Sequence, residues 1–161
     1  MIFVTVGMQL SFDRLVRSVA SWAQEKGRED IIFQVGPKGF CPEGFTCMEQ
    51  CEPLEFEKYV SESELLIAHA GMGTILKALE LSKPLIIMPR REKYKEHRTD
   101  HQVATAMKFS VYSGIIVAEG EYELYSLLSS SIKSDIRETI SSRASVQLLQ
   151  YTNNFIKKSL A

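Results

Sequence analysis

The sequence predicts a doubly wound α/β domain, in which a parallel sheet is covered by helices on both faces. Two observations lead to this fold class. Short apolar segments that suit β-strands alternate with segments whose apolar residues recur at the helical period. Several strand segments, such as Leu65–Ala68 and Leu85–Met88, are continuously apolar, as strands buried on both faces are. A chain of 161 residues suits one domain.

The first elements begin at the N-terminus. Ile2–Val6 is a β-branched and aromatic run and is expected to form a strand. Apolar residues then recur at the helical period up to Gly27, which is expected to end a helix whose N-cap is Ser11 or Asp13. Ile31–Val35 is expected to be the second strand. Further strands are expected at Phe45–Met48, Leu65–Ala68, Leu85–Met88 and Gly114–Val117, and further helices near Phe56–Val60, Ile75–Leu81 and His101–Phe109.

Two parts of the domain are distinguished by their pattern. Residues 1–120 are expected to form the Rossmann-like part, and residues 121–161 a C-terminal helical segment of the same domain. In that segment Ala144, Leu148, Tyr151 and Phe155 recur at helical spacing, which predicts one apolar helix face. We favour packing of this face on its own domain, and the alternative is a docking surface for a second subunit.

The composition is that of an ordinary globular protein, with 45% hydrophobic and 24% charged residues. A net charge of −1 gives no reason to expect a nucleic-acid partner. The N-terminus lacks a basic region, and no window approaches the roughly 18 apolar residues of a membrane span. These features predict a cytoplasmic chain.

Cys41, Cys47 and Cys51 lie close together, without a Cys-x-x-Cys pair and without a neighbouring histidine. This spacing gives little support to a zinc site. An odd number of cysteines in a cytoplasmic chain favours reduced, unligated thiols.

Unusual residues follow three of the expected strands, at Gly7-Met8-Gln9, at His69–Thr74 and in the loop after Pro89. Because ligands of open parallel sheets bind beyond the carboxyl ends of the strands, these three segments are expected to converge on one site. The loop from Arg90 to Arg98 also contains five cationic side chains and two glutamates. Its excess of positive charge could attract an anionic ligand.

The turn His69-Ala70-Gly71-Met72-Gly73-Thr74 is the strongest site motif. Its two glycines allow backbone N–H groups to approach a ligand, and the following helix presents the positive end of its dipole. Thr74 can donate a hydroxyl hydrogen bond, and His69 can donate to a phosphate oxygen. The alternative is that the glycines only allow tight strand-to-helix packing.

This motif does not stand alone. Together with three further segments it resembles glycosyltransferase family 28, the donor-binding C-terminal half of GT-B glycosyltransferases. The segments that match are Val4–Gly7, Glu64–Thr74, Lys83–Pro89 and Asp100–Gln102. Within the family the likeness is to the small subunits of split enzymes, namely the eukaryotic dolichol-linked N-acetylglucosamine transferase and bacterial exopolysaccharide subunits of the PssE type. It covers roughly residues 1–117, and residues 64–106 are its most specific part.

The resemblance implies roles for individual residues. The histidine and glycine turn holds the donor diphosphate, and His69 is the candidate catalytic residue, because it would stabilise the leaving group. The segment after the basic loop contacts the transferred sugar, and the loop after the first strand lines the crevice. The residues expected to bind the donor are Gly7, Met8, Gln9, Gly36, His69, Gly71, Met72, Gly73, Thr74, Arg90, Arg91, Asp100, His101 and Gln102.

One position departs from the family pattern. A glutamate in the helix after the glycine turn often contacts the ribose hydroxyls in the family, and here that position is Lys77. A lysine cannot accept hydrogen bonds from these hydroxyls. Glu80 is a candidate substitute, and Arg90 or Arg91 is expected to clamp the diphosphate.

The resemblance also implies a function that needs a partner. A GT-B active site lies between two Rossmann-like domains, and this chain has the length of one. We therefore expect a UDP-sugar donor site that turns over, with inversion, only beside a membrane-anchored subunit that recognises a lipid-linked sugar acceptor. That partner is expected to supply the catalytic base and to recruit the chain to the inner face of the membrane.

The sequence leaves two alternative functions. The first is a non-catalytic sugar-nucleotide-binding or scaffold subunit that stabilises a partner enzyme. The second is a metallohydrolase, suggested by His97, Asp100 and His101, but no complete ligand set accompanies these residues. We therefore expect no metal and no cofactor.

Overall fold

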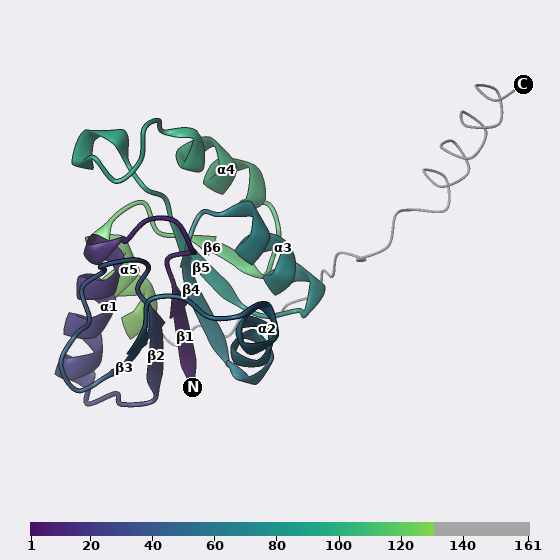
Figure 1. Ribbon diagram of the computed structural model, residues 1–161. Helices are drawn as coiled ribbons and strands as arrows, with labels where there is room; N and C mark the ends of the chain where they lie inside the picture. The colour runs from purple at the N-terminus through teal and green to yellow at the C-terminus, as the bar shows by residue number, and fades with distance from the viewer. Residues whose placement is uncertain (131–161) are drawn as a thin grey trace, which may run out of the picture.

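The computed structural model describes residues 1–130, which form an all-parallel six-stranded sheet with helices on both faces (Figure 1). The strands are β1 (Ile2–Thr5), β2 (Ile31–Gln34), β3 (Thr46–Met48), β4 (Leu65–His69), β5 (Leu85–Met88) and β6 (Ile115–Val117). The helices are α1 (Asp13–Lys26), α2 (Pro53–Glu62), α3 (Met72–Glu80), α4 (His101–Phe109) and α5 (Glu121–Ser129), with a 3-10 turn η1 (Glu92–Tyr94). The predicted fold class is confirmed.

The strand order β3-β2-β1-β4-β5-β6 reverses direction between β1 and β4. Thr5 of β1 is paired with Ala68 of β4, so the residues that follow these two strands emerge side by side. A reversal of this kind is where doubly wound sheets open a crevice beyond their carboxyl ends. The topology therefore places the two glycine-bearing strand ends at one position.

The sheet has two hydrophobic cores, one on each face, and the strands β1, β2, β4, β5 and β6 contribute side chains to both. Ile67 and Ile86 pack with the α1 and α5 side, whereas Leu66 and Ile87 pack with α2, α3 and α4. All four side chains are fully buried. This burial on both faces explains why β4 and β5 are apolar throughout rather than alternating.

The beginning of α1 differs from the prediction, and its end agrees with it. Phe12 is the N-cap, and no side chain caps the helix, so the expectation for Ser11 or Asp13 is wrong. The Asp13 carboxylate instead accepts a hydrogen bond of 3.0 Å from the Phe40 N–H. Gly27 ends the helix in the left-handed conformation at φ 62°, which favours glycine.

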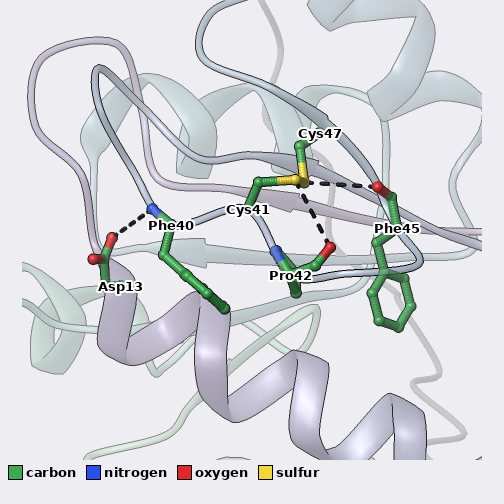
Figure 2. Close-up of a disulfide and its surroundings, with 6 residues drawn as sticks. All are labelled: Asp13, Phe40, Cys41, Pro42, Phe45 and Cys47. Atoms are coloured by element: carbon green, nitrogen blue, oxygen red, sulfur yellow. Dashed lines mark hydrogen bonds between the residues drawn. A yellow bond between two sulfur atoms is a disulfide. The ribbon is translucent and has the colours of Figure 1, made fainter.

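The prediction of three reduced thiols is wrong for two of them. A disulfide joins Cys41, in the turn-rich segment between β2 and β3, to Cys47 in β3 (Figure 2). Cys51 is a free, buried thiol, and burial raises its pKa. The disulfide closes a loop whose beginning is already tied to α1 through Phe40, a link that spacing along the sequence does not reveal.

The other predicted elements agree with the structure to within a few residues. The difference is largest at α2, which begins at Pro53 and is longer than the expected segment. Proline suits the first turn of a helix, because its missing N–H would have no intrahelical partner there.

The apolar face predicted from Ala144, Leu148, Tyr151 and Phe155 lies outside the described residues. Within residues 1–130, none of the helices combines the length and apolarity needed to cross a membrane.

The two-sided burial of β5 generates a stability prediction. Shortening Ile86 to alanine should lower the free energy of unfolding by about 2–5 kcal/mol, and Ile86→Val by about 1 kcal/mol, because each change leaves a void in a packed core. Leu54→Ala is the control, because Leu54 is 84% exposed. Denaturant titration measures all three. Equal stabilities of Ile86→Ala and Leu54→Ala would contradict this account of the core.

Candidate functional site

The three strand ends singled out in the sequence meet around one cavity of about 240 Å³. It is lined by the loop after β1, by the last residue of β4 and by the segments after β5. The lining residues are Val6, Gly7, Met8, Gln9, Leu10, His69, Arg90, His97 and Gln102. Six of these nine are among the residues expected to bind the donor, namely Gly7, Met8, Gln9, His69, Arg90 and Gln102.

The His69 ring lies between two glycines. A Cβ atom on Gly7 would sit 2.8 Å from Cε1 of the ring, and one on Gly71 would sit 2.1 Å from Nε2. Gly7 also has φ +82°, which few other residues adopt. No side chain could occupy either position without displacing the ring. The two glycines therefore have a packing role as well as the ligand-approach role that the sequence suggests.

His69 is largely buried and is held neutral. Burial, together with the nearby charge of Arg90, lowers its pKa to about 4, although the Thr5 backbone lies close enough to oppose the shift. Its Nδ1 atom is buried and makes no hydrogen bond of normal geometry within residues 1–130. At neutral pH the ring therefore carries one N–H donor and one acceptor nitrogen, and the residue lines the cavity.

The N-terminus of α3 borders the site from the other side. Gly71 is the N-cap, and the first intrahelical bond runs from the Ile75 N–H to the Gly71 carbonyl at 3.1 Å. The N–H groups of Met72, Gly73 and Thr74 thus precede the first helical hydrogen bond and are available to a ligand. No side chain or backbone lies within 4 Å of a Cβ built on Gly73. This arrangement suits an anion.

A second cavity of about 400 Å³ adjoins the first. The two share Gly7 and Met8, so the loop after β1 separates them. The second cavity is enclosed by β1, β2, α2 and the first turns of α3. Its lining residues are Thr5, Gly7, Met8, Gln34, Cys51, Pro53, Phe56, Glu57, Gly73, Thr74 and Lys77. An extended ligand that crosses the Gly7-Met8 loop could occupy both cavities.

Arg90 has a different role from the expected diphosphate clamp. Its guanidinium is 2% exposed and donates hydrogen bonds to the carbonyls of Val6 and Leu10 at 2.9 and 2.7 Å, and also to that of Ser11. It lies 4.7 Å from the centre of the Phe12 ring. Burial lowers its pKa to about 10, which still leaves it charged at neutral pH. Arg90 therefore fixes the loop after β1 from the wall of the first cavity.

Gln102 lines the first cavity, as expected of a ligand contact. Its side chain is 5% exposed, and its Oε1 accepts a hydrogen bond of 3.1 Å from the Arg90 N–H. The side-chain amide group of Gln102 makes no other hydrogen bond in the described part of the chain. Its oxygen already accepts a hydrogen bond, and its Nε2 group can donate to a ligand.

Six of the expected binding residues line neither cavity, namely Gly36, Gly71, Met72, Arg91, Asp100 and His101. Arg91 forms an ion pair of 3.1 Å with Glu119, and the Asp100 carboxylate accepts a hydrogen bond from the Glu92 N–H. His101 is exposed and contacts Thr99. These contacts do not direct the three side chains toward His69.

Gly36 also lies outside both cavities, and it packs against the loop after β1. It has φ +75°, and a Cβ there would sit 2.8 Å from the Leu10 carbonyl oxygen. Its role is therefore close packing under the loop after β1 rather than contact with a ligand.

Two residues of the loop from Arg90 to Arg98, Glu96 and His97, have contacts that the sequence did not predict. Glu96 binds the Arg14 guanidinium at 2.6 and 2.8 Å, and also accepts a hydrogen bond from the Arg91 N–H. This carboxylate offsets part of the local positive charge. His97 lines the first cavity, and its ring lies 4.3 Å from that of His101. Within residues 1–130, no three or more His, Cys, Asp or Glu side chains group closely enough to hold a metal ion.

Known proteins are similar to this chain in sequence. The chain is similar to two mammalian proteins, both described as UDP-N-acetylglucosamine transferase subunit ALG13. The mouse protein is 32% identical over 106 residues, which make up 60% of this chain and 9% of that protein. The human protein is 29% identical over 109 residues, or 62% of this chain and 10% of that protein. The chain thus spans about a tenth of the length of these relatives.

Solved structures show the same fold. An NMR solution structure of ALG13 superposes with a TM-score of 0.58 and 21% identity, covering 88% of this chain and 90% of that one. The crystal structure of the glycotransferase of kitacinnamycin gives a TM-score of 0.58 at 14% identity, covering 78% of this chain and 33% of that one. The family model of the glycosyltransferase family 28 C-terminal domain matches residues 1–148. That match, over most of the chain and including every motif described above, shows that the chain belongs to this glycosyltransferase family.

Proposed function

We propose that the chain is the donor-binding subunit of a two-component inverting glycosyltransferase, which moves a sugar from a UDP-sugar to a lipid-linked acceptor. The observation that carries this proposal is the pair of adjoining cavities around Gly7, the smaller lined by His69 and the larger by Gly73 and Thr74 of the first turn of α3. A nucleotide sugar matches this pair of cavities, because its anionic diphosphate links two uncharged parts, the nucleoside and the sugar. Family membership supports the same class of ligand.

The diphosphate is assigned to the junction of the two cavities. The free N–H groups of Met72, Gly73 and Thr74 provide donors there, and the helix dipole favours the negative charge. The neutral His69 ring adds one N–H donor, which stabilises the departing diphosphate when the sugar bond breaks. The charge on the leaving group would thus be met by preorganised donors rather than by a metal.

The sugar is assigned to the smaller cavity, and the nucleoside to the larger one. Gln9 and Gln102 offer polar groups in the smaller cavity, as hydroxyl-rich ligands require. Pro53 and Phe56 provide the apolar wall of the larger cavity, which suits a planar base. We place Asp100 and His101 at the outer edge, where a partner subunit or the bound sugar could reach them.

The acceptor site is assigned to a partner. The described residues form one Rossmann-like unit, and the relatives with similar sequence are described as subunits of a transferase. We propose that a membrane-anchored subunit recognises the lipid-linked sugar, supplies the base and recruits this chain to the membrane in polysaccharide or glycolipid synthesis.

Removing the His69 ring tests the donor site. His69→Ala should weaken binding of UDP and UDP-N-acetylglucosamine at least tenfold in calorimetric titration, because a phosphate-directed donor and its packing against two glycines are lost. Met107→Ala is the control and should bind as the wild type does, since Met107 is 67% exposed and lies outside both cavities. Unchanged binding by His69→Ala would refute the site. Absence of uridine-nucleotide binding by the wild type would favour a scaffold subunit.

The neutral state of His69 predicts a pH dependence of stability. Its pKa is about 4 in the folded chain and near 6.5 when unfolded, so the unfolded state binds more protons between these values. Stability should therefore fall as the pH drops from 6.5 to 4, by up to about 3 kcal/mol from this one group. His69→Gln should remove that part of the slope. Denaturant titrations at several pH values measure it, and parallel profiles for the two proteins would contradict a buried neutral ring.

Turnover should require the partner. Incubated alone with a radiolabelled UDP-sugar and a lipid-linked acceptor, the purified chain should form almost no product, and membranes that contain the partner subunit should restore transfer. The His69→Ala variant with the same membranes is the control for a donor site on this chain. Robust transfer by the chain alone would show that acceptor recognition does not need a second subunit.

A further inference from the structure

We infer that Glu57, positioned by Lys77, binds the ribose hydroxyls of the donor and makes the larger cavity selective for ribonucleotides. This inference rests on the proposed function, because it takes the ligand to be a nucleoside diphosphate. It concerns a residue of α2 that no sequence motif singled out. Its basis is the chemistry of the cavity lining and an ion-pair network between α2 and α3.

The lining of the larger cavity has three kinds of surface. Cys51, Pro53 and Phe56 are apolar, and Thr5 and Gln34 are uncharged and polar. The remaining side-chain charges are one carboxylate and one ammonium, those of Glu57 and Lys77. Glu57 is thus the one acidic group among the described residues that line this cavity. A carboxylate only accepts hydrogen bonds, and its two oxygens match the two O–H donors of a ribose cis-diol.

Lys77 holds this carboxylate in place without saturating it. Its Nζ lies 2.8 Å from Glu80 Oε2 and 3.5 Å from Glu57 Oε1. The shorter contact anchors the ammonium to its own helix, and Glu80 does not line the cavity. The longer contact is an ion pair beyond ordinary hydrogen-bond distance, so both oxygens of Glu57 remain available as acceptors. Glu57 is 51% exposed and can be reached by a ligand.

The position of Lys77 along α3 suits contact with the ribose of a bound nucleotide. Lys77 follows Gly73 by four residues, which is about 6 Å along the helix axis. A diphosphate on the free N–H groups of the first turn therefore places the attached ribose near the next turn. Lys77 and its partner Glu57 lie there, on the wall that α2 and α3 share.

Gln34 independently indicates that this cavity is built for a polar ligand. Its side chain is 1% exposed, and its Oε1 accepts a hydrogen bond of 2.5 Å from the Thr5 hydroxyl. Its Nε2 makes no hydrogen bond within residues 1–130, although the residue lines the cavity. That amide group can therefore donate to a polar ligand in the cavity. The carbonyl of a nucleobase is an acceptor of the required kind.

The test compares two ligands that differ only in the hydroxyls. Calorimetry should show that the wild-type chain binds UDP at least tenfold more tightly than 2′,3′-dideoxy-UDP, because two hydrogen bonds to a carboxylate are lost. Glu57→Ala should bind both nucleotides equally, at the level of wild type with the dideoxy compound. Glu62→Ala is the control on the same helix, exposed and outside the cavity, and should keep the full difference.

The outcomes separate this inference from the proposed function. Tight UDP binding that His69→Ala abolishes, with no discrimination against the dideoxy compound, would overturn the role of Glu57 and leave the donor site intact. Discrimination that persists in Glu57→Ala would do the same. Failure of the wild-type chain to bind either nucleotide would overturn both.

Discussion

The packing of the His69 ring against Gly7 and Gly71 is the contact on which the site depends. It joins the ends of β1 and β4 at the reversal of strand order, and it leaves no room for a Cβ on either glycine. The same packing buries the ring, which lowers its pKa to about 4 and keeps it neutral. A single close contact thus sets the backbone path, the width of the crevice and the protonation of the candidate catalytic residue.

The remainder of the site is arranged around that contact by buried polar groups. Arg90 holds the loop after β1 through backbone carbonyls, and its own N–H holds Gln102 in the wall of the cavity. A charged guanidinium in such a position is stabilised by the carbonyl dipoles around it, and removing it would leave several carbonyls unpaired. Glu96 ties the basic loop to Arg14 on α1 in a similar way. Two cationic side chains of this loop, Arg90 and Arg91, thus pair with other parts of the chain.

Much of this arrangement was predictable from the sequence, for a definite reason. Parallel strands end at the same edge of a sheet, so residues that follow apolar runs, such as Gly7, His69 and Arg90, must lie near one another. Burial and pairing were not predictable, because they depend on contacts between distant segments. The sequence alone could not show that Arg90 faces inward, that Cys41 pairs with Cys47, or that α2 brings a carboxylate to α3. The type of each residue indicated which interactions its side chain could make, whereas the neighbouring helices and strands determined which of them it makes.

Binding of the diphosphate at the first turn of α3 is the central claim, and amide chemical shifts test it directly. Addition of UDP to the ¹⁵N-labelled chain should shift the backbone amide signals of Met72, Gly73 and Thr74 most strongly, followed by those of Gly7 and Met8. Signals from the surface around Arg91 and Glu119 should stay in place, because those side chains pair with each other outside both cavities. Shifts confined to that surface, or absent from the first turn of α3, would contradict the account.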